Sequence, residues 1–214
     1  MAHKLSLALV AACLACASIA VPSAAASQPG LAKRVVAAAP STAAPSAAEE
    51  SRGLIASVSV CPGQEDLDAS AEAQEATMRC MIAYARSQSG LAGLADDEAL
   101  EQSAADKAND VIGCDDFSHF ACGRDFTYWM QEAGYMSSPC WRVGENLAWG
   151  NGAYGTVRSI FRAWMSSPGH RANILNDFAQ TGISLKIGTL AGQPGTHVWT
   201  QHFGTHCDAP PIQD

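Results

Sequence analysis

The chain contains histidines and glutamates whose side chains could do chemistry, among them His119, Glu145 and His170. Imidazole nitrogens and a carboxylate oxygen are common zinc ligands, and three of them leave a position open for water, as in hydrolytic zinc sites. Glu145 is then the candidate catalytic base. The same side chains also suit a metal-free cluster in which both imidazoles bond Glu145 across a cleft. The sequence leaves both interpretations open.

Other catalytic motifs are absent or lack their context. The chain contains neither an H-E-x-x-H zinc-protease helix nor a G-x-S-x-G nucleophile elbow. Residues 150–155 satisfy G-x-G-x-x-G, but a nucleotide fold needs further parallel strands for which the chain has no room. We therefore predict no nucleotide cofactor.

The N-terminus predicts export. Residues 1–26 combine a basic start, an apolar run and an A-x-A cleavage site, which is typical of a signal peptide. A lipid anchor through Cys13 is the alternative. No transmembrane segment is expected in the mature protein, and the formal charge of -8 argues against nucleic-acid partners and polybasic membrane binding.

Cleavage leaves six cysteines, and an even number outside the cell predicts three disulfides. The short spacing favours Cys114 with Cys122; the further pairs expected are Cys61 with Cys80, and Cys140 with Cys207. A metal site made of Cys114, His119 and Cys122 is less compatible with an oxidising compartment.

One folded domain is expected. Residues 27–60 are rich in Ala, Pro, Ser and Thr and have no aromatic residue, which predicts a disordered leader. The domain then covers 61–207, and 208–214 form a C-terminal tail.

Hydrophobic periodicity predicts helices first and a hairpin last. Apolar residues fall at helical spacing near 78–85, 100–111, 126–133 and 157–164, and a short helix restarts at 170–175. Residues 183–187 and 197–203 alternate around a glycine-containing turn, and 146–149 suit a short strand. The order indicates an α+β fold with helices packed on an antiparallel sheet.

The dispersed polar residues also lie in ordered motifs. These are Phe117-Ser118-His119, Gly144-Glu145-Asn146, Pro168-Gly169-His170-Arg171-Ala172-Asn173 and Thr181-Gly182-Ile183. In this order, over about residues 78–204, the chain resembles the CAP superfamily, named for cysteine-rich secretory proteins, antigen 5 and pathogenesis-related 1 proteins, in its bacterial SCP-like branch. The resemblance implies an α-β-α sandwich with a small antiparallel sheet between helical layers.

The resemblance also implies a cleft with two histidines and two glutamates that often holds zinc or another divalent cation. Carried over by motif, the histidines are His119 and His170, and one glutamate is Glu145. Ser167 stands where the second family glutamate is expected, and no Asp or Glu lies between Glu145 and Asp177. Any cation would thus have two imidazoles and one carboxylate.

Two functions follow as hypotheses. The first is a secreted binding module for an extracellular ligand, whether lipid, peptide or envelope component. The second is a metal-dependent hydrolase acting on peptides or cell-envelope esters. Asn146 and Asn173 are expected to tie loops to backbone groups, whereas His197, His202 and His206 are expected to be solvated or satisfied in the core rather than ligands.

Overall fold

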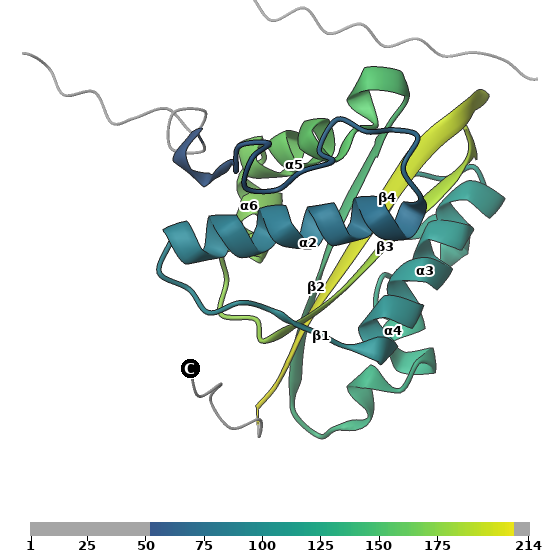
Figure 1. Ribbon diagram of the computed structural model, residues 1–214. Helices are drawn as coiled ribbons and strands as arrows, with labels where there is room; N and C mark the ends of the chain where they lie inside the picture. The colour runs from purple at the N-terminus through teal and green to yellow at the C-terminus, as the bar shows by residue number, and fades with distance from the viewer. Residues whose placement is uncertain (1–51, 208–214) are drawn as a thin grey trace, which may run out of the picture. The chain divides into compact units, whose positions relative to one another are not determined.

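The computed structural model describes residues 52–207 (Figure 1). The predicted signal peptide, the lipid-anchor cysteine, residues 27–51 of the leader and the tail from residue 208 lie outside these residues. The elements run η1 (Arg52–Leu54), α2 (Ala71–Gln88), β1 (Ala95–Asp96), α3 (Glu98–Gly113), η2 (Ala121–Gly123), α4 (Tyr128–Glu132), η3 (Tyr135–Ser137), β2 (Trp141–Gly150), η4 (Gly152–Tyr154), α5 (Val157–Ser166), α6 (Pro168–Ile174), β3 (Gln180–Leu190) and β4 (Gln193–His206).

The helix starts follow from capping residues. The side chains of Ser70, Asp97 and Thr156 each accept a hydrogen bond from a backbone N–H in the first turn of α2, α3 and α5. Proline is compatible with a first helical turn, so Pro168 begins α6 directly after α5 instead of only ending the preceding helix.

The sheet has the order β1-β3-β4-β2. β4 pairs antiparallel with both β3 and β2, and the two-residue strand β1 pairs in parallel with the start of β3. β2 is longer than the predicted strand and includes Glu145.

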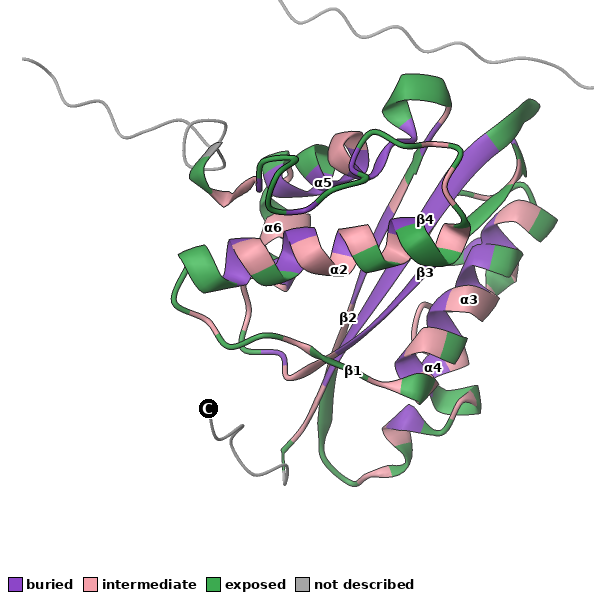
Figure 2. Cartoon of the chain, in the orientation of Figure 1, coloured by how far each residue is buried: buried purple, intermediate pink, exposed green. Residues whose placement is uncertain are grey.

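Helices cover both faces of the sheet, which confirms the predicted α-β-α arrangement (Figure 1). On one face α2, α5 and α6 pack against Trp199 and Phe203 of β4. On the other, Val111 of α3 packs against Val198 of β4. β4 is therefore buried through the consecutive residues 196–204, as the purple along most of the strand shows in Figure 2. The alternation in its sequence does not separate a core face from a solvent face.

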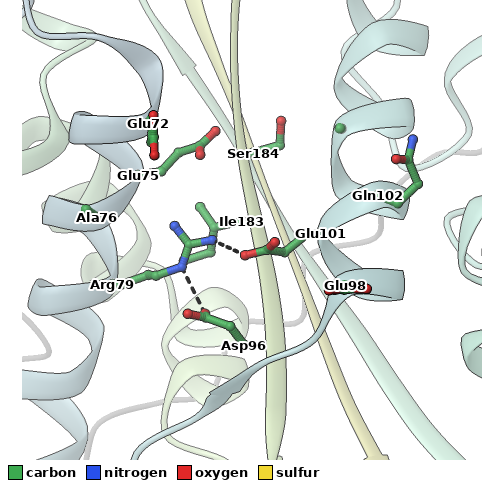
Figure 3. Close-up of a pocket in the computed structure, with 11 residues that line it drawn as sticks. Glu72, Glu75, Ala76, Arg79, Asp96, Glu98, Glu101, Gln102, Ile183 and Ser184 are labelled. Atoms are coloured by element: carbon green, nitrogen blue, oxygen red, sulfur yellow. Dashed lines mark hydrogen bonds and ion pairs between the residues drawn. The ribbon is translucent and has the colours of Figure 1, made fainter.

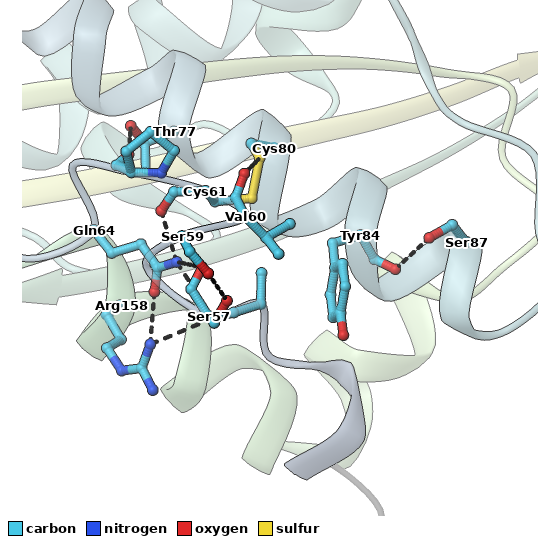
Figure 4. Close-up of a disulfide and its surroundings, with 12 residues drawn as sticks. Ser57, Ser59, Val60, Cys61, Gln64, Thr77, Cys80, Tyr84, Ser87 and Arg158 are labelled. Atoms are coloured by element: carbon cyan, nitrogen blue, oxygen red, sulfur yellow. Dashed lines mark hydrogen bonds between the residues drawn. A yellow bond between two sulfur atoms is a disulfide. The ribbon is translucent and has the colours of Figure 1, made fainter.

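All three predicted disulfides are present: Cys61–Cys80, Cys114–Cys122 and Cys140–Cys207. They fasten three places where the chain is irregular. Cys61–Cys80 joins the N-terminal loop to α2 (Figure 4). Cys114–Cys122 closes the loop after α3, and Cys140–Cys207 joins the start of β2 to the end of β4.

The start of the ordered unit corrects the predicted boundary at Cys61. Ala56 is completely buried in the main core, with Leu54 and Ile55 packed beside it. The side chain of Gln64 donates to the carbonyls of Ala56, Ser57 and Cys61 (Figure 4). A leader that contains three consecutive apolar residues near its end can bury them, so the last part of 27–60 belongs to the fold.

Candidate functional site

Glu145 lies at the centre of the candidate site, in the middle of β2. Its side chain is only 1% exposed although β2 is an edge strand. In the β2–β4 register Glu145 stands directly opposite His202. Directly opposed residues of an antiparallel pair share one face, so the carboxylate and this imidazole point to the same side of the sheet.

Both carboxylate oxygens of Glu145 are bonded to imidazoles. Nδ1 of His119 lies 2.5 Å from Oε1, and Nε2 of His202 lies 3.0 Å from Oε2. His119 comes from the loop that Cys114–Cys122 closes, and its side chain is 51% exposed. His202 is completely buried. The carboxylate thus joins one buried ring to one ring that reaches solvent.

These contacts determine the charges. Burial raises the pKa of Glu145, but the hydrogen bonds from His119 and His202 outweigh it and hold the pKa below its usual value. The same bond with Glu145 raises the pKa of His119 despite partial burial. The pair therefore favours a carboxylate beside an imidazolium.

Ser103 completes a hydrogen-bonded row. Its hydroxyl lies 2.7 Å from Nδ1 of His202 and 2.9 Å from the carbonyl of Leu100. Ser103, His202 and Glu145 have the residue types of a hydrolase triad, but Ser103 and His202 are both completely buried. A substrate cannot reach this hydroxyl, so the row orients Glu145 and does not supply a nucleophile.

Lys107 lies one helical turn beyond Ser103 on α3 and is also completely buried. Its ammonium group has no hydrogen-bond partner in the described part of the chain. Burial lowers its pKa, and the negative charge of Glu145 opposes this effect most strongly. Burying a cation without a direct partner costs free energy of folding. Lys107 is therefore a feature of the site and not a routine core residue.

The third predicted residue, His170, is not joined to the other two. Its ring makes no hydrogen bond to a described residue; its backbone carbonyl accepts from Asn146 at 3.2 Å. Burial lowers its pKa, and the charge of His119 lowers it further. His170 therefore lies within electrostatic reach of the cluster but outside its bonds.

Asn146 and Asn173 bond to backbone carbonyls, as predicted, but they join helix α6 to strand β2 and not loops. The Asn173 amide donates to the side-chain oxygen of Asn146 at 2.9 Å and to the backbone carbonyl of Glu145 at 3.2 Å. These bonds fix the helix that carries His170 beside the strand that carries Glu145.

A cavity of about 390 Å³ opens beside this cluster. His119, Glu145 and Asn173 line it together with the aromatic rings of Phe120 and Phe126. Asp125 supplies a second carboxylate to the cavity, although it lies in a different segment from Ser167, where the second family glutamate was expected. His170 is not among the lining residues. The cavity combines apolar walls with a few polar groups, the usual character of a small-ligand site.

As the described side chains lie, His119, Glu145 and His170 do not form a three-ligand metal site. Among residues 52–207, no group of three or more His, Cys, Asp or Glu side chains is placed to hold a metal ion. Both oxygens of Glu145 already accept hydrogen bonds from imidazoles. Cys114 and Cys122 are bonded to each other, so they leave no thiolate for the cysteine–histidine alternative.

Sequence reasoning missed the roles of His202, Ser103 and Lys107. His202 forms its hydrogen bonds within the core, as expected, but one of its partners is the candidate site residue Glu145. A signal for it was present: if Cys140 pairs with Cys207 across antiparallel strands, counting inward from that pair places Glu145 opposite His202. A signal for Lys107 was also present, because it lies seven residues after Leu100 and four before Val111, on the helix face that these apolar residues mark as the core side.

None of the helices among residues 52–207 is both long and apolar enough to cross a bilayer.

Comparison with known proteins agrees with the fold. Uncharacterized protein YkwD of Bacillus subtilis (strain 168) is 32% identical over 120 residues, which cover 55% of this chain and 42% of that protein. The match thus spans less than half of the relative's length.

A solved structure shares the fold. An outer surface protein from Borrelia burgdorferi aligns with a TM-score of 0.54 and 21% identity, over 64% of this chain and 96% of that chain. An extracellular protein containing an SCP domain from Bacillus anthracis str. Ames aligns with a TM-score of 0.49 and 20% identity, over 63% of this chain and 43% of that chain.

The model of the cysteine-rich secretory protein family, CAP, matches residues 81–203. This region runs from α2 to β4 and includes His119, Glu145, His170 and His202. The chain therefore belongs to the CAP family of cysteine-rich secretory proteins.

Proposed function

We propose that this CAP-domain protein is exported and acts outside the cell as a ligand-binding module, with the cavity beside His119 as its binding site. The observation that carries the proposal is the fixed imidazole of His119. It faces a cavity with aromatic walls and is held in place by a buried carboxylate. The three disulfides suit an oxidising compartment.

The ligand needs an apolar part for Phe120 and Phe126 and a polar group for His119 and Asn173. Lipids, peptides and envelope fragments all meet this requirement. Binding without chemistry is the simpler proposal because the hydroxyl nearest the cluster, that of Ser103, is buried away from the cavity.

The test is a thermal-shift and calorimetry series with named probes: sodium palmitate, a Phe-containing tripeptide library and soluble fragments of digested bacterial cell wall. We expect one probe class to raise the melting temperature of the wild type. His119→Ala and Phe120→Ala should lose the shift. Tyr154→Ala is the matched aromatic control, because Tyr154 is 80% exposed and does not line the cavity. A shift that survives both cavity variants would contradict the proposal.

The metal-dependent hydrolase has less support, since both carboxylate oxygens of Glu145 are engaged by imidazoles. Zinc or another divalent cation bound by His119, Glu145 and His170 stays a prediction. Calorimetric titration with zinc chloride tests it in the wild type, His119→Ala and His170→Ala. Turnover of peptide or ester panels that is abolished by a chelator and by Glu145→Gln would replace the binding module with the enzyme.

A further inference from the structure

The outer edge of β3 has no neighbouring strand over most of its length. β1 pairs only with Gln180 and Thr181, and no other described strand lies on this side. The backbone N–H of Leu185 points to this edge, since it donates to the Glu75 carboxylate at 2.7 Å. Backbone groups alternate sides along a strand, so Ile183 and Ile187 present theirs to the same edge. Such an edge is a template for one more strand.

A groove of about 640 Å³ runs along this edge between α2 and α3 (Figure 3). Five carboxylates line it: Glu72, Glu75, Asp96, Glu98 and Glu101. The one cation among these described lining residues, Arg79, is already paired with Asp96 and Glu101, as the dashed lines in Figure 3 show. Five carboxylates against one guanidinium give the groove a formal charge of -4 when all are ionised.

Glu75 lies in this groove and is affected by its neighbouring carboxylates. Burial raises its pKa, and the nearby Glu101 and Glu72 raise it further against the lowering effects of Leu185 and Arg79. A cationic group entering the groove would relieve this repulsion.

From the open edge and the charge of the groove, we infer that β3 binds an extended cationic peptide segment of a partner protein. The segment adds as a strand beside Ile183–Ile187 and directs lysine or arginine side chains toward Glu72 and Glu98. An extended chain fits because no strand pairs with this edge beyond Thr181, although the N–H of Leu185 is bonded to the Glu75 carboxylate, which the incoming strand would displace. A second copy of this chain is a poor occupant, since its own formal charge is -8.

The site is separate from the cavity at Glu145, and its test does not depend on the ligand proposed there. Acidic side chains also protect sheet edges from unwanted pairing. If that were their only role, the carboxylates would keep other strands away from this edge. A cationic strand would then not bind there in register either.

The experiment titrates the full chain with a synthetic capped peptide of alternating lysine and valine, eight residues long. The matched control is the same peptide with N-methyl groups on the alternate amides that would face β3. The charge is unchanged, but the backbone ladder cannot form. We expect at least roughly tenfold weaker binding of the methylated peptide, because two or more hydrogen bonds are lost. NMR should show the amides of Ile183 and Ile187 protected by the unmethylated peptide alone.

Charge is tested on the protein side. Glu72 and Glu98 make no side-chain hydrogen bond to another described residue, so Glu72→Gln and Glu98→Gln remove charge without breaking a contact. Each should weaken binding roughly threefold at low salt, and about 0.5 M sodium chloride should weaken it further. Glu132→Gln on α4, outside the groove, is the control and should have no effect.

Several results would overturn the inference: no binding by the folded wild type, equal affinity for the methylated peptide, equal weakening by Glu132→Gln, or protection at amides away from β3. Sedimentation that shows two chains joined through this edge would make the occupant a second copy and would also overturn it.

Discussion

Glu145 shows how one carboxylate can be buried in an edge strand and still carry charge. It accepts from His119 and His202, and Ser103 supports His202 from behind. Each added bond favours the ionised form, which is why the pKa of Glu145 falls although burial alone would raise it. The more exposed partner, His119, is in turn favoured as a cation.

Replacing Glu145 by Gln should lower the pKa of His119 toward its ordinary value near 6.5, because the main cause of the raised value is lost. A His with a raised folded pKa stabilises the fold fully below its unfolded pKa, and this stabilisation is lost as pH rises through the folded pKa. The wild type should therefore exceed Glu145→Gln in stability more at about pH 5.5 than at about pH 9.

NMR titration of the His119 ring and urea unfolding at the two pH values measure this effect. An unchanged His119 pKa in Glu145→Gln would show that the short contact in the structure has no energetic weight. His206 serves as the internal reference, since it bonds the carbonyl of Tyr135 and not Glu145.

Replacing Lys107 should stabilise the protein, whereas replacing Glu145 should destabilise it. Its ammonium group is buried without a hydrogen bond to any described residue, and such groups cost roughly 1–3 kcal/mol. Lys107→Met keeps a side chain of similar length and removes the buried ammonium group. It should raise the free energy of unfolding by about 1 kcal/mol, measured by urea denaturation near neutral pH. Lys186→Met, at an exposed position of β3, should change it by less than about 0.5 kcal/mol.

A loss of stability in Lys107→Met would contradict this account and would mean that attraction to Glu145 exceeds the cost of burial. The variant also tests the site, because the pKa of Glu145 should rise once a nearby cation is removed.

At the scale of elements, glycines allow α3 to lie directly on the sheet. A Cβ added to Gly182 of β3 would lie 2.1 Å from the backbone carbonyl carbon of Leu100 in α3. This close approach brings Ser103 within reach of His202 on β4. The position of α3 therefore decides the geometry of the buried half of the site.

Gly182→Ala should destabilise the fold by roughly 1–3 kcal/mol, because two backbones must separate to admit one methyl group. Thermal and urea unfolding measure the loss. Gly93→Ala is the control, since nothing described lies within 4 Å of its added Cβ, and it should be nearly neutral. A neutral Gly182→Ala would mean that α3 can shift away from β3 without cost.

The elements also show which features sequence could predict. α2, α3 and α5 were predictable because a capping residue and a helical apolar stripe agree in each. β2 was underestimated, since Trp141 and Arg142 are exposed and carry no core signal. His119 and Glu145 were identified through motif resemblance, whereas the order Ser103–His202–Glu145 depends on strand register and helix placement that local patterns do not encode.

At the scale of the molecule, the disulfides differ greatly in the loops they close. Cys140–Cys207 spans 67 residues and Cys114–Cys122 spans 8. In the chain-entropy model a longer closed loop restricts the unfolded chain more, by about 4 kcal/mol and about 2.5 kcal/mol for these two loops.

Cys140→Ser/Cys207→Ser should therefore lose more stability than Cys114→Ser/Cys122→Ser, and comparison of the two double variants by urea unfolding tests the order. The smaller loop carries His119, so its opening should also move the His119 pKa toward its ordinary value. The reverse order of stabilities would indicate native-state effects beyond loop closure.

The three cross-links also set how far the folded unit can be stretched. A pull between Cys61 and Cys207 bypasses most of the chain through sulfur bridges, leaving about 50 residues to extend, or roughly 180 Å of contour. The reduced chain would yield roughly 500 Å between the same points. In the oxidised protein, Cys61 and Cys207 can thus separate by only about a third of the distance that the backbone permits, even after every helix and strand between them has unfolded.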